Sequence, residues 1–478
     1  MKYFIKTFGC QMNVSDSERI AAFLEQHNFS VTDNIKEADL TIFNTCGIKQ
    51  TAENRAYSMI NNLRKKHKTW NIEHGTKQEN AKSKVIVMTG CLANRADVQK
   101  RMKSKVDLFF PVKDIREFEN WIIENYLEIG NWKLEIAAPN KITNKENIAY
   151  LSINPKYSSN YAAYVPIMTG CNNFCSYCVV PNARGREVSR PAEEIIKEIK
   201  DLVAKGYKSI TLLGQNVNSY KSPTTINYQL STKNTQKEIN FSKLLKKINS
   251  IPGKFWISFV SSHPKDMTDE LIETVARCKK VCEWIHLPVQ AGDDEILRRM
   301  NRKYTQKHYL EQIKKIRKAF VKIRGKSVLI SVSSDIIVGF PGETKKQFLE
   351  SAAVMKKSKF DMVFFGQYSP RPETVAWKMK DNVSQKEKAR RENYLNEILK
   401  KTAFANNKKY VGKTFEVLIE RVKSTAADNA SRKSFICFGK TRTQKNVKIV
   451  SNKKIQIGTF VKVKIIKANI WNLEGRAE

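Results

Sequence analysis

Three closely spaced cysteines are the residues of this chain best suited to bind a metal. The segment Gly170–Cys178 reads GCNNFCSYC and contains Cys171, Cys175 and Cys178. Three thiolates at this spacing suit an iron–sulfur cluster, in which each iron takes one protein ligand. A four-iron cluster held by three thiolates keeps one iron open to an exogenous ligand. Zinc is the alternative metal, but a structural zinc site takes four ligands, and no fourth Cys or His lies nearby in the sequence.

A second set of three cysteines is dispersed along the first hundred residues. Cys10, Cys46 and Cys91 each follow a predicted strand and precede a predicted helix, in the contexts FGC, NTC and TGC. In an open parallel sheet, the carboxyl ends of the strands meet at one edge, where ligands bind. The pattern therefore predicts a second thiol site at that edge. Three unrelated buried residues are the alternative, because free cysteine is often part of a core.

The other three cysteines, Cys278, Cys282 and Cys437, show no ligand spacing that a third partner completes. An odd total of nine argues against a complete disulfide framework, and thiols in a reducing compartment are more often ligands or catalysts than bridges. We expect these three residues to be structural.

The first part of the chain alternates strands and helices, which predicts a Rossmann-like, mostly parallel sheet over residues 1–135. Its predicted strands are Lys2–Thr7, Asp39–Asn44, Lys84–Met88 and Leu108–Phe110, and its predicted helices are Ser15–His27, Lys49–Lys66 and Asn94–Met102. A polar insertion is expected at 65–84 and an interdomain linker at 129–160.

A second alternating series predicts a central partial (β/α)6 barrel over residues 157–400. The predicted strands are Ala163–Met168, Ser209–Leu213, Phe255–Phe259, Trp284–Val289, Leu329–Val338 and Met362–Phe365. The main predicted helices are Pro191–Ala204, Asp269–Cys278, Gln306–Phe320 and Thr344–Lys357. The first strand leads directly into the Cys171 segment, and a polar insertion is expected at 222–238.

The carboxyl-terminal part predicts a long helix, Ser384–Asn406, followed by a small antiparallel β-barrel over residues 405–475. Its predicted strands are Thr414–Glu420, Phe435–Gly439, Val447–Val450 and Thr459–Ala468. Residues 401–478 carry 18 Lys and Arg against 5 Asp and Glu. Such a basic barrel is suited to nucleic acid, although a structural cap is the alternative.

Composition agrees with a large, basic, globular protein. The 478 residues carry a net charge of +38, which attracts polyanions such as nucleic acid; a lysine-rich proteome would be the other source of this charge. No apolar run reaches the length of a membrane helix, and the amino-terminal residues lack the apolar core of a secretory signal. We expect a cytoplasmic protein with no membrane association.

The chain resembles a known family, the radical S-adenosylmethionine methylthiotransferases. The resemblance extends over nearly the whole chain, and the carboxyl barrel resembles the family's RNA-binding TRAM domain. Besides the Cys171 segment, it is carried by Lys6–Asn13 (KTFGCQMN), Asn44–Cys46 (NTC), Thr89–Cys91 (TGC), Arg184–Glu187 (RGRE), Leu213–Tyr220 (LGQNVNSY), His286–Gln290 (HLPVQ) and Asp335–Thr344 (DIIVGFPGET).

The resemblance implies two 4Fe-4S clusters and S-adenosylmethionine as cofactors. Cys171, Cys175 and Cys178 would hold the catalytic cluster that cleaves S-adenosylmethionine to a carbon radical, and Cys10, Cys46 and Cys91 would hold a second cluster that carries the inserted sulfur. Cofactor binding is expected at the residues beside the adenine and at the barrel mouth, namely Tyr177, Gly214, Gln215, Asn216 and Gln290. The last four residues are equally compatible with turns at strand ends.

The family branch with the most similar motifs implies the substrate. It converts N6-(dimethylallyl)adenosine at position 37, next to the anticodon of tRNA, to the 2-methylthio derivative. We therefore expect the tRNA anticodon stem-loop as partner, an electron donor such as flavodoxin or ferredoxin, and a monomer. The alternatives are N6-threonylcarbamoyladenosine in tRNA as the substrate, or an RNA-binding iron–sulfur protein without sulfur insertion.

Overall fold

The computed structural model describes residues 1–47, 50–73, 84–127, 150–222, 238–424 and 435–478. Most of the predicted linker and of the insertion at 222–238 lies outside these residues, as does part of the insertion at 65–84. The chain forms two compact units. Unit 1 comprises residues 1–158, 168–190 and 371–377, and unit 2 comprises 159–167, 191–370 and 378–478.

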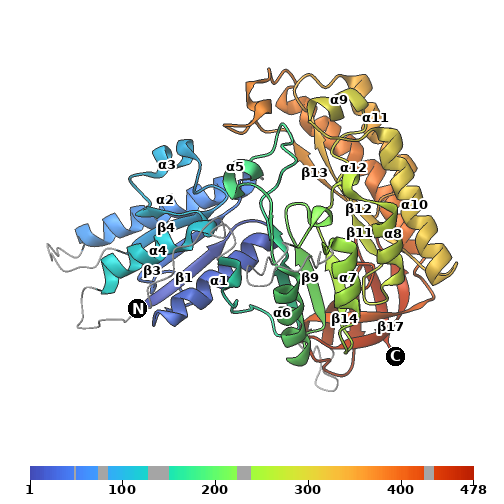
Figure 1. Cartoon of the computed structure of the whole chain (residues 1–478), viewed down its shortest axis with the longest axis horizontal. Coiled ribbons are helices and arrows are strands. Elements are labelled where there is room, and N and C mark those ends of the chain that lie inside the picture. The colour runs from blue at the N-terminus through green and yellow to red at the C-terminus, as the bar shows by residue number, and fades with distance from the viewer. Residues whose placement is uncertain (48–49, 74–83, 128–149, 223–237, 425–434) are drawn as a thin grey trace, which may run out of the picture. The chain divides into compact units, whose positions relative to one another are not determined.

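Unit 1 is built on a parallel five-stranded sheet of order β2-β1-β3-β4-β5, which confirms the predicted fold (Figure 1). The sequence patterns missed the short strand β2 and the helix α4. The elements are β1 (Lys2–Thr7), α1 (Gln11–Gln26), β2 (Ser30–Val31), β3 (Leu40–Thr45), α2 (Gln50–Glu73), β4 (Val85–Gly90), α3 (Ala96–Met102), β5 (Leu108–Phe109) and α4 (Ile115–Ile122). Helix α2 continues to Glu73, so the predicted insertion begins later than expected.

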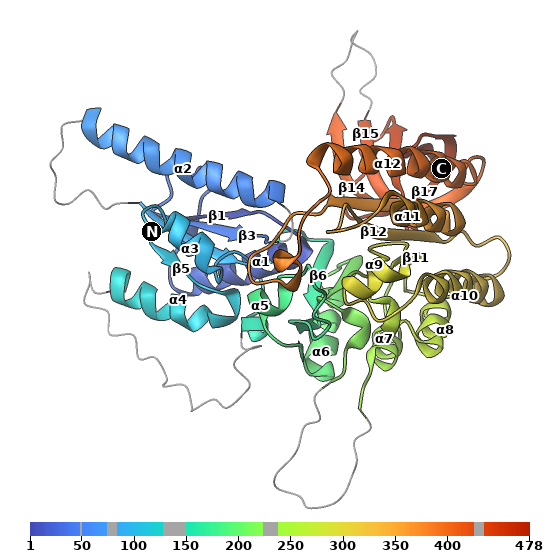
Figure 2. The same cartoon turned by 90° about the horizontal axis from the view of Figure 1, so that it is seen from above.

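Helices cover both faces of this sheet because its central strands are apolar on both sides. In β3, the side chain of Ile42 packs with α1 and α4, whereas that of Phe43 packs with α2 and α3. Helices α2 and α4 accordingly lie on opposite sides of the sheet (Figure 2). Because β1, β3 and β4 pair in parallel, their carboxyl ends lie at a single edge of the sheet.

Unit 2 contains the six strands of the predicted partial barrel, arranged as two parallel three-stranded sheets of order β10-β9-β6 and β11-β12-β13. A parallel bridge between Ile257 and Val281 connects them. The strands are β6 (Ala162–Pro166), β9 (Ser209–Leu213), β10 (Trp256–Phe259), β11 (Trp284–His286), β12 (Ser331–Val338) and β13 (Met362–Gln367), and the main helices are α6 (Ala192–Ala204), α7 (Phe241–Asn249), α8 (Asp269–Arg277), α9 (Asp294–Arg299), α10 (Gln306–Arg324) and α11 (Lys345–Ser358).

The carboxyl-terminal strands form a closed barrel of order β14-β15-β16-β18-β17, after the helix α12 (Gln385–Lys408). The expected antiparallel barrel is confirmed with one correction, because β16 and β18 pair in parallel. The final strand β18, which the sequence patterns missed, pairs antiparallel with β17 and fills the place between β17 and β16. The barrel strands are β14 (Thr414–Ser424), β15 (Phe435–Thr441), β16 (Asn446–Ser451), β17 (Phe460–Ala468) and β18 (Leu473–Ala477).

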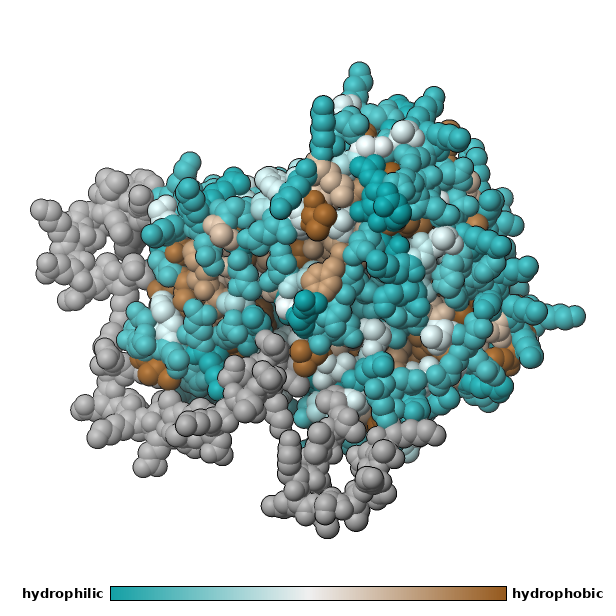
Figure 3. All heavy atoms as spheres, turned by 45° about the horizontal axis from the view of Figure 1, so that its top comes forward, coloured by the Kyte–Doolittle hydropathy of each residue, from teal (hydrophilic) through white to brown (hydrophobic). Residues whose placement is uncertain are grey.

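Hydrophilic residues dominate the face shown in Figure 3, and hydrophobic ones form small, separate patches on it. Within the described ranges, no helix combines the length and the apolar composition that crossing a membrane requires.

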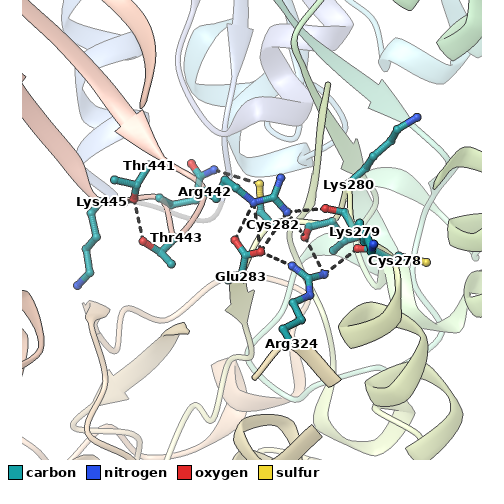
Figure 4. A network of polar contacts seen from close by, with 12 residues as sticks. Cys278, Lys279, Lys280, Cys282, Glu283, Arg324, Thr441, Arg442, Thr443 and Lys445 are labelled. Carbon is teal, nitrogen blue, oxygen red and sulfur yellow. Dashed lines mark hydrogen bonds and ion pairs between the residues drawn. The ribbon is translucent and has the colours of Figure 1, made fainter. Parts of the chain in front are cut away.

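The carboxyl barrel is attached to the partial barrel by a half-buried ion-pair network within unit 2. Glu283, directly before β11, accepts hydrogen bonds from Arg442 (2.9 Å to Nε) and from Arg324 (Figure 4). Arg442 also donates to the carbonyls of Lys279 (2.7 Å) and Val281 (2.9 Å). Because Glu283 precedes its strand, the carboxyl barrel docks at the amino ends of the strands, opposite to the end where ligands bind in such barrels.

Candidate metal centres

The loops that carry Cys10, Cys46 and Cys91 lie side by side, because they follow the adjacent strands β1, β3 and β4. The amide of Phe8 donates to the carbonyl of Asn44 over 2.7 Å, and the amide of Cys91 donates to the carbonyl of Thr45 over 2.8 Å. Cys46 and Cys91 are buried, whereas Cys10 is exposed. The structure thus brings these three predicted ligands to one edge of the sheet.

Two glycines permit this close approach. A Cβ at Gly9 would lie 2.8 Å from the Cβ of Cys46, and a Cβ at Gly90 would lie 2.3 Å from the carbonyl oxygen of Thr45. Gly90 also has a φ of +84°, a conformation that residues with a Cβ rarely adopt. The glycines of FGC and TGC are therefore steric requirements of the three-cysteine site.

Two buried asparagines join the first two loops. The amide nitrogen of Asn13 donates to the side-chain oxygen of Asn44 over 2.8 Å, and that of Asn44 donates to the backbone carbonyl of Asn13 over 2.8 Å. Both residues are completely buried. The sequence analysis included these two asparagines only as parts of motifs. Their closeness in sequence to Cys10 and Cys46 could have indicated that they support the site.

Positive charge from other parts of unit 1 reaches these cysteines. Although Cys10 contacts solvent, burial of its sulfur raises the pKa of its thiol, and the guanidinium of Arg184 acts in the opposite direction. Burial lowers the pKa of Arg371, while Glu53 and, more weakly, Cys46 favour its charged form. These two arginines are functional candidates that ligand spacing alone does not reveal.

The Cys171 segment forms a loop whose backbone places hydrogen-bond donors near the sulfurs. Asn173 Nδ2 donates to the sulfur of Cys171 over 3.5 Å, and the amide of Val180 donates to the sulfur of Cys178 over 3.5 Å. Burial raises the pKa of the Cys171 thiol, and the neighbouring Cys175 raises it further, while a backbone hydrogen bond from Asn173 lowers it. These donors would stabilise thiolates bound to iron.

Both donor sets fit a four-iron cluster that has one open iron. Each offers three thiols from one region of unit 1, and neither is joined by a fourth Cys or His in sequence. Among the described residues, no three His, Cys, Asp or Glu side chains surround a point where a single metal ion would sit. A structural zinc site takes four ligands, whereas a four-iron cluster held by three thiolates keeps one iron open.

The residues expected to bind S-adenosylmethionine have mixed surroundings. Asn216, after β9, donates from Nδ2 to Asp266 over 2.8 Å. Among the described residues, three buried oxygens have no hydrogen-bond partner: Oδ1 of Asn216, Oε1 of Gln215 and Oγ of Ser262, which follows β10. Unsatisfied buried polar atoms are rare in native proteins and fit the binding of a polar ligand. Ser262 was not predicted.

The remaining predicted contacts are less informative. Gln290 has a φ of +68°, and its backbone hydrogen bonds with Asp335 and Ile337 form a parallel bridge to Ile336, so the structure shows it paired with β12. Gly214 directly follows β9, and Tyr177 is half-buried within the cysteine loop of unit 1. Their contact with a cofactor stays a prediction.

Cys278, Cys282 and Cys437 are buried, as expected of structural residues. Burial raises the pKa of each thiol, to about 12 for Cys282. A thiol that stays protonated at neutral pH is a poor nucleophile and a poor ligand.

Three family models match the chain in succession. They are the uncharacterized protein family UPF0004 at residues 2–111, the radical SAM superfamily at 165–355, and the TRAM domain at 408–477. The radical SAM superfamily uses S-adenosylmethionine together with a 4Fe-4S cluster, which agrees with the donor set of the Cys171 loop.

Among solved structures, the chain resembles a cobalamin-dependent S-adenosylmethionine radical enzyme, OxsB, with a TM-score of 0.51 and 10% identity. The match covers 83% of this chain and 55% of that chain, so this chain spans about half of the solved one. A likeness at this identity shows the fold alone.

Curated relatives match over almost the full length. Proteins named tRNA-2-methylthio-N(6)-dimethylallyladenosine synthase are 39% identical in Clostridium botulinum and 41% identical in Clostridium novyi, in each case over 99% of this chain and 96% of the relative. The synthase of Thermoanaerobacter pseudethanolicus is 39% identical over 99% of this chain and 92% of its own length. The chain therefore belongs to the radical S-adenosylmethionine methylthiotransferase family.

Proposed function

We propose that this protein converts N6-(dimethylallyl)adenosine at position 37 of tRNA to its 2-methylthio derivative. The observation that carries the proposal is the presence, in one compact unit, of two separate sites that each offer three thiols. A purely structural cluster has no use for an open iron, and an enzyme with one task would need a single such site. The names of the full-length relatives support the same substrate.

The two sites divide the work between them. Cys171, Cys175 and Cys178 would hold the cluster that binds S-adenosylmethionine, and Cys10, Cys46 and Cys91 would hold a second 4Fe-4S cluster. When bound, these cofactors supply reductive cleavage of S-adenosylmethionine to a carbon radical and a sulfur atom for transfer. Carbon 2 of an adenine needs this chemistry because its C–H bond is too inert for side-chain acids and bases.

The chain's own residues position these groups. The N–H donors of Asn173 and Val180 orient the sulfurs of the radical site. Gln215, Asn216 and Ser262 present unsatisfied oxygens suited to the polar groups of S-adenosylmethionine, such as its ammonium group. Tyr177 would lie beside the adenine of that cofactor. Burial of Cys46 and Cys91 limits the access of water to two of the three thiols of the second site, whereas Cys10 lies on its solvent side.

We also propose the remaining partners. The basic carboxyl barrel would bind tRNA phosphates, and a small redox protein such as flavodoxin or ferredoxin would reduce the radical cluster. The enzyme would act in the cytoplasm as a monomer. Size-exclusion chromatography with light scattering, with and without an anticodon stem-loop RNA, tests the monomer and its complex directly.

Mass analysis of tRNA nucleosides tests the substrate. Deleting the gene should remove 2-methylthio-N6-(dimethylallyl)adenosine and leave N6-(dimethylallyl)adenosine in its place. Wild-type protein should restore the product, whereas a variant with Ala at Cys171, Cys175 and Cys178 should not. Loss of a 2-methylthio derivative of N6-threonylcarbamoyladenosine would instead identify that nucleoside as the substrate. No change in any methylthiolated nucleoside would support an RNA-binding role without sulfur insertion.

A further inference from the structure

The segment Arg371–Trp377 of unit 1 is held rigidly against the radical cysteine loop. Arg371 forms a buried ion pair with Glu53 of α2, with 2.7 Å between Nη1 and Oε2. Farther along the segment, the amide of Ala376 donates to the carbonyl of Ser176 over 2.7 Å. Ser176 lies between Cys175 and Cys178, so this hydrogen bond joins the segment to the loop that carries the predicted ligands.

Internal hydrogen bonds fix the shape of the segment between these two points. The hydroxyl of Thr374 donates to the carbonyl of Arg371 over 2.7 Å, and the amide of Trp377 donates to the carbonyl of Thr374 over 3.1 Å. Asn182 Nδ2 also donates to the carbonyl of Glu373 over 3.3 Å. Thr374 and Ala376 are buried, so the backbone presents the side chains of Val375 and Trp377 in a defined direction.

These side chains are large, apolar and exposed. Val375 is 64% exposed and Trp377 is 49% exposed, and Phe174 of the cysteine loop is 40% exposed. Phe174 has a φ of +47°, a conformation that bulky residues rarely adopt, and the guanidinium of Arg186 lies 4.3 Å from its ring centroid. The fold therefore exposes the rings of Trp377 and Phe174 to solvent, on a backbone that hydrogen bonds hold in place.

Exposed aromatics in a rigid setting mark an interaction site. The surrounding charge points to the class of partner. Arg186 is exposed, and the exposed Lys378 and Lys380 follow Trp377 in the sequence; the acids beside them are Glu187, Glu373 and Asp381, of which Asp381 is already paired with Lys388 over 2.6 Å. Flat rings with basic neighbours are the usual platform for the bases of single-stranded RNA, because every base has a stacking face and every nucleotide carries a phosphate.

We propose that Trp377 and Phe174 form a stacking platform for unpaired bases of the tRNA anticodon loop, beside the radical cysteine loop. This inference rests on the proposed function and identifies which surface receives the RNA loop. Stacking here would hold a neighbouring base while the target adenosine is turned out of its own stack, a movement that requires a few kcal/mol in nucleic acids.

Binding measurements on the reconstituted holoenzyme test the platform. The variants are Trp377→Leu, which keeps apolar area but removes the π face, and Trp377→Phe, which keeps a ring. Leu349→Ala is the matched control, because Leu349 is an exposed apolar residue of α11 in unit 2, with 42% exposure. The probes are an anticodon stem-loop that carries N6-(dimethylallyl)adenosine and a fully paired duplex of the same stem sequence.

We expect Trp377→Leu to weaken binding of the stem-loop about tenfold, in line with the loss of one stacked base, and to leave duplex binding unchanged. Trp377→Phe should retain most of the affinity. The dependence of binding on salt should stay as in the wild type, because stacking releases no counterions. An abasic nucleotide at the stacked loop position should abolish the difference between Trp377→Leu and wild type.

Several outcomes would overturn the platform. They are wild-type affinity in Trp377→Leu, an equal loss for loop and duplex, and the same loss in Leu349→Ala. Slower reduction of the Trp377→Leu cluster by flavodoxin, with unchanged RNA binding, would assign the surface to the electron donor instead. The proposed function would survive each of these results if the variant still made the 2-methylthio nucleoside.

Discussion

Arg184 and Asp16 form a buried ion pair, with 2.6 Å between Nη2 of the guanidinium and Oδ2 of the carboxylate. Arg184 ends α5 (Val180–Arg184), directly after the radical cysteine loop, and Asp16 belongs to α1, which begins after Cys10. Burial opposes the charge of Arg184, but Asp16 and then Cys91 raise its pKa above the usual value. One ion pair thus couples the surroundings of both cysteine sets.

Replacing Arg184 with Gln should destabilise the protein strongly. The other carboxylate oxygen of Asp16 has no partner among the described residues, so the variant leaves a buried charge uncompensated. Breaking such a pair typically lowers the free energy of unfolding by about 3–5 kcal/mol. Urea unfolding, monitored together with iron content, measures the effect. Replacing both residues, as Arg184→Met with Asp16→Leu, should lower the free energy of unfolding by less than Arg184→Gln does. An equal loss of stability in the double variant would mean that the pair does more than neutralise charge.

Removing either cysteine set should remove one cluster. Anaerobically reconstituted wild type should hold two 4Fe-4S clusters, about eight irons per chain. Ala at Cys171, Cys175 and Cys178 should halve the iron and abolish cleavage of S-adenosylmethionine. Ala at Cys10, Cys46 and Cys91 should also halve the iron and abolish methylthiolation, but some cleavage should continue because the radical site keeps its own ligands. Iron and sulfide content measures the number of clusters, and release of deoxyadenosine measures cleavage of S-adenosylmethionine. Unchanged iron content in either variant would refute the ligand set that the variant removes.

The sequence predicted that Cys10, Cys46 and Cys91 follow adjacent parallel strands, and the structure confirms that placement; cluster binding at both cysteine sets stays a prediction. The parallel direction of β1, β3 and β4 followed from the alternation of strands and helices, whereas the order of the strands in the sheet was not predicted. The carboxyl barrel was recognised by its period-two strands, but its parallel pair was missed. Leu473–Ala477 is short and includes Gly475, so its pattern is weak.

Long-range polar contacts could not be predicted, because their partners lie far apart in the chain. Nothing local to Arg371 indicates that its guanidinium meets Glu53, and Glu283 gives no sign of Arg442. The predicted domains followed sequence order, whereas 168–190 and 371–377 pack with the amino-terminal sheet. That packing depends on buried ion pairs, which a periodicity argument cannot detect.

Stability should fall as the pH drops below about 6.5, in part because of His263. Burial, followed by the charges of Arg302 and Lys265, lowers its pKa to about 2, and its Nδ1 accepts a hydrogen bond from the amide of Lys265 over 3.2 Å. The unfolded state therefore binds a proton that the folded state excludes. This group's stabilisation is complete above the unfolded pKa and should decrease by about 2 kcal/mol between pH 7 and pH 5.

Urea unfolding of wild type and His263→Asn across that range isolates this effect. Asn keeps an acceptor near the position of Nδ1 but does not titrate, so the variant should lose less stability than the wild type by about that amount. Parallel pH profiles for the two proteins would show that His263 is solvated or charged in the folded state.

Docking of the carboxyl barrel should depend on Arg442. Its replacement by Ala removes hydrogen bonds to Glu283 and to two backbone carbonyls, and a hydrogen bond of a charged group typically contributes about 1.5–3 kcal/mol. Limited proteolysis between α12 and β14 should become faster, while Arg442→Lys should be intermediate because an ammonium cannot form the same fork. Deleting the barrel is a poorer test, because Leu418 and Phe460 pack on Trp256 and Cys282, which the deletion would expose.

RNA binding by the barrel should depend on exposed lysines rather than on this docking network. Lys462 and Lys464 are exposed on β17, where they alternate with the buried Val463 and Ile465. Removing one lysine that binds a phosphate should lower the magnitude of the slope of log affinity against log salt by about 0.7–0.9, so Lys462→Ala with Lys464→Ala should reduce that magnitude by roughly 1.4–1.8. Filter binding of full-length tRNA at several salt concentrations measures the slope. Arg442→Ala is the contrasting variant, since it should weaken binding by loosening the barrel without changing the slope. An unchanged slope in the double lysine variant would mean that this face of the barrel does not bind the backbone of tRNA, and that its charge has another origin.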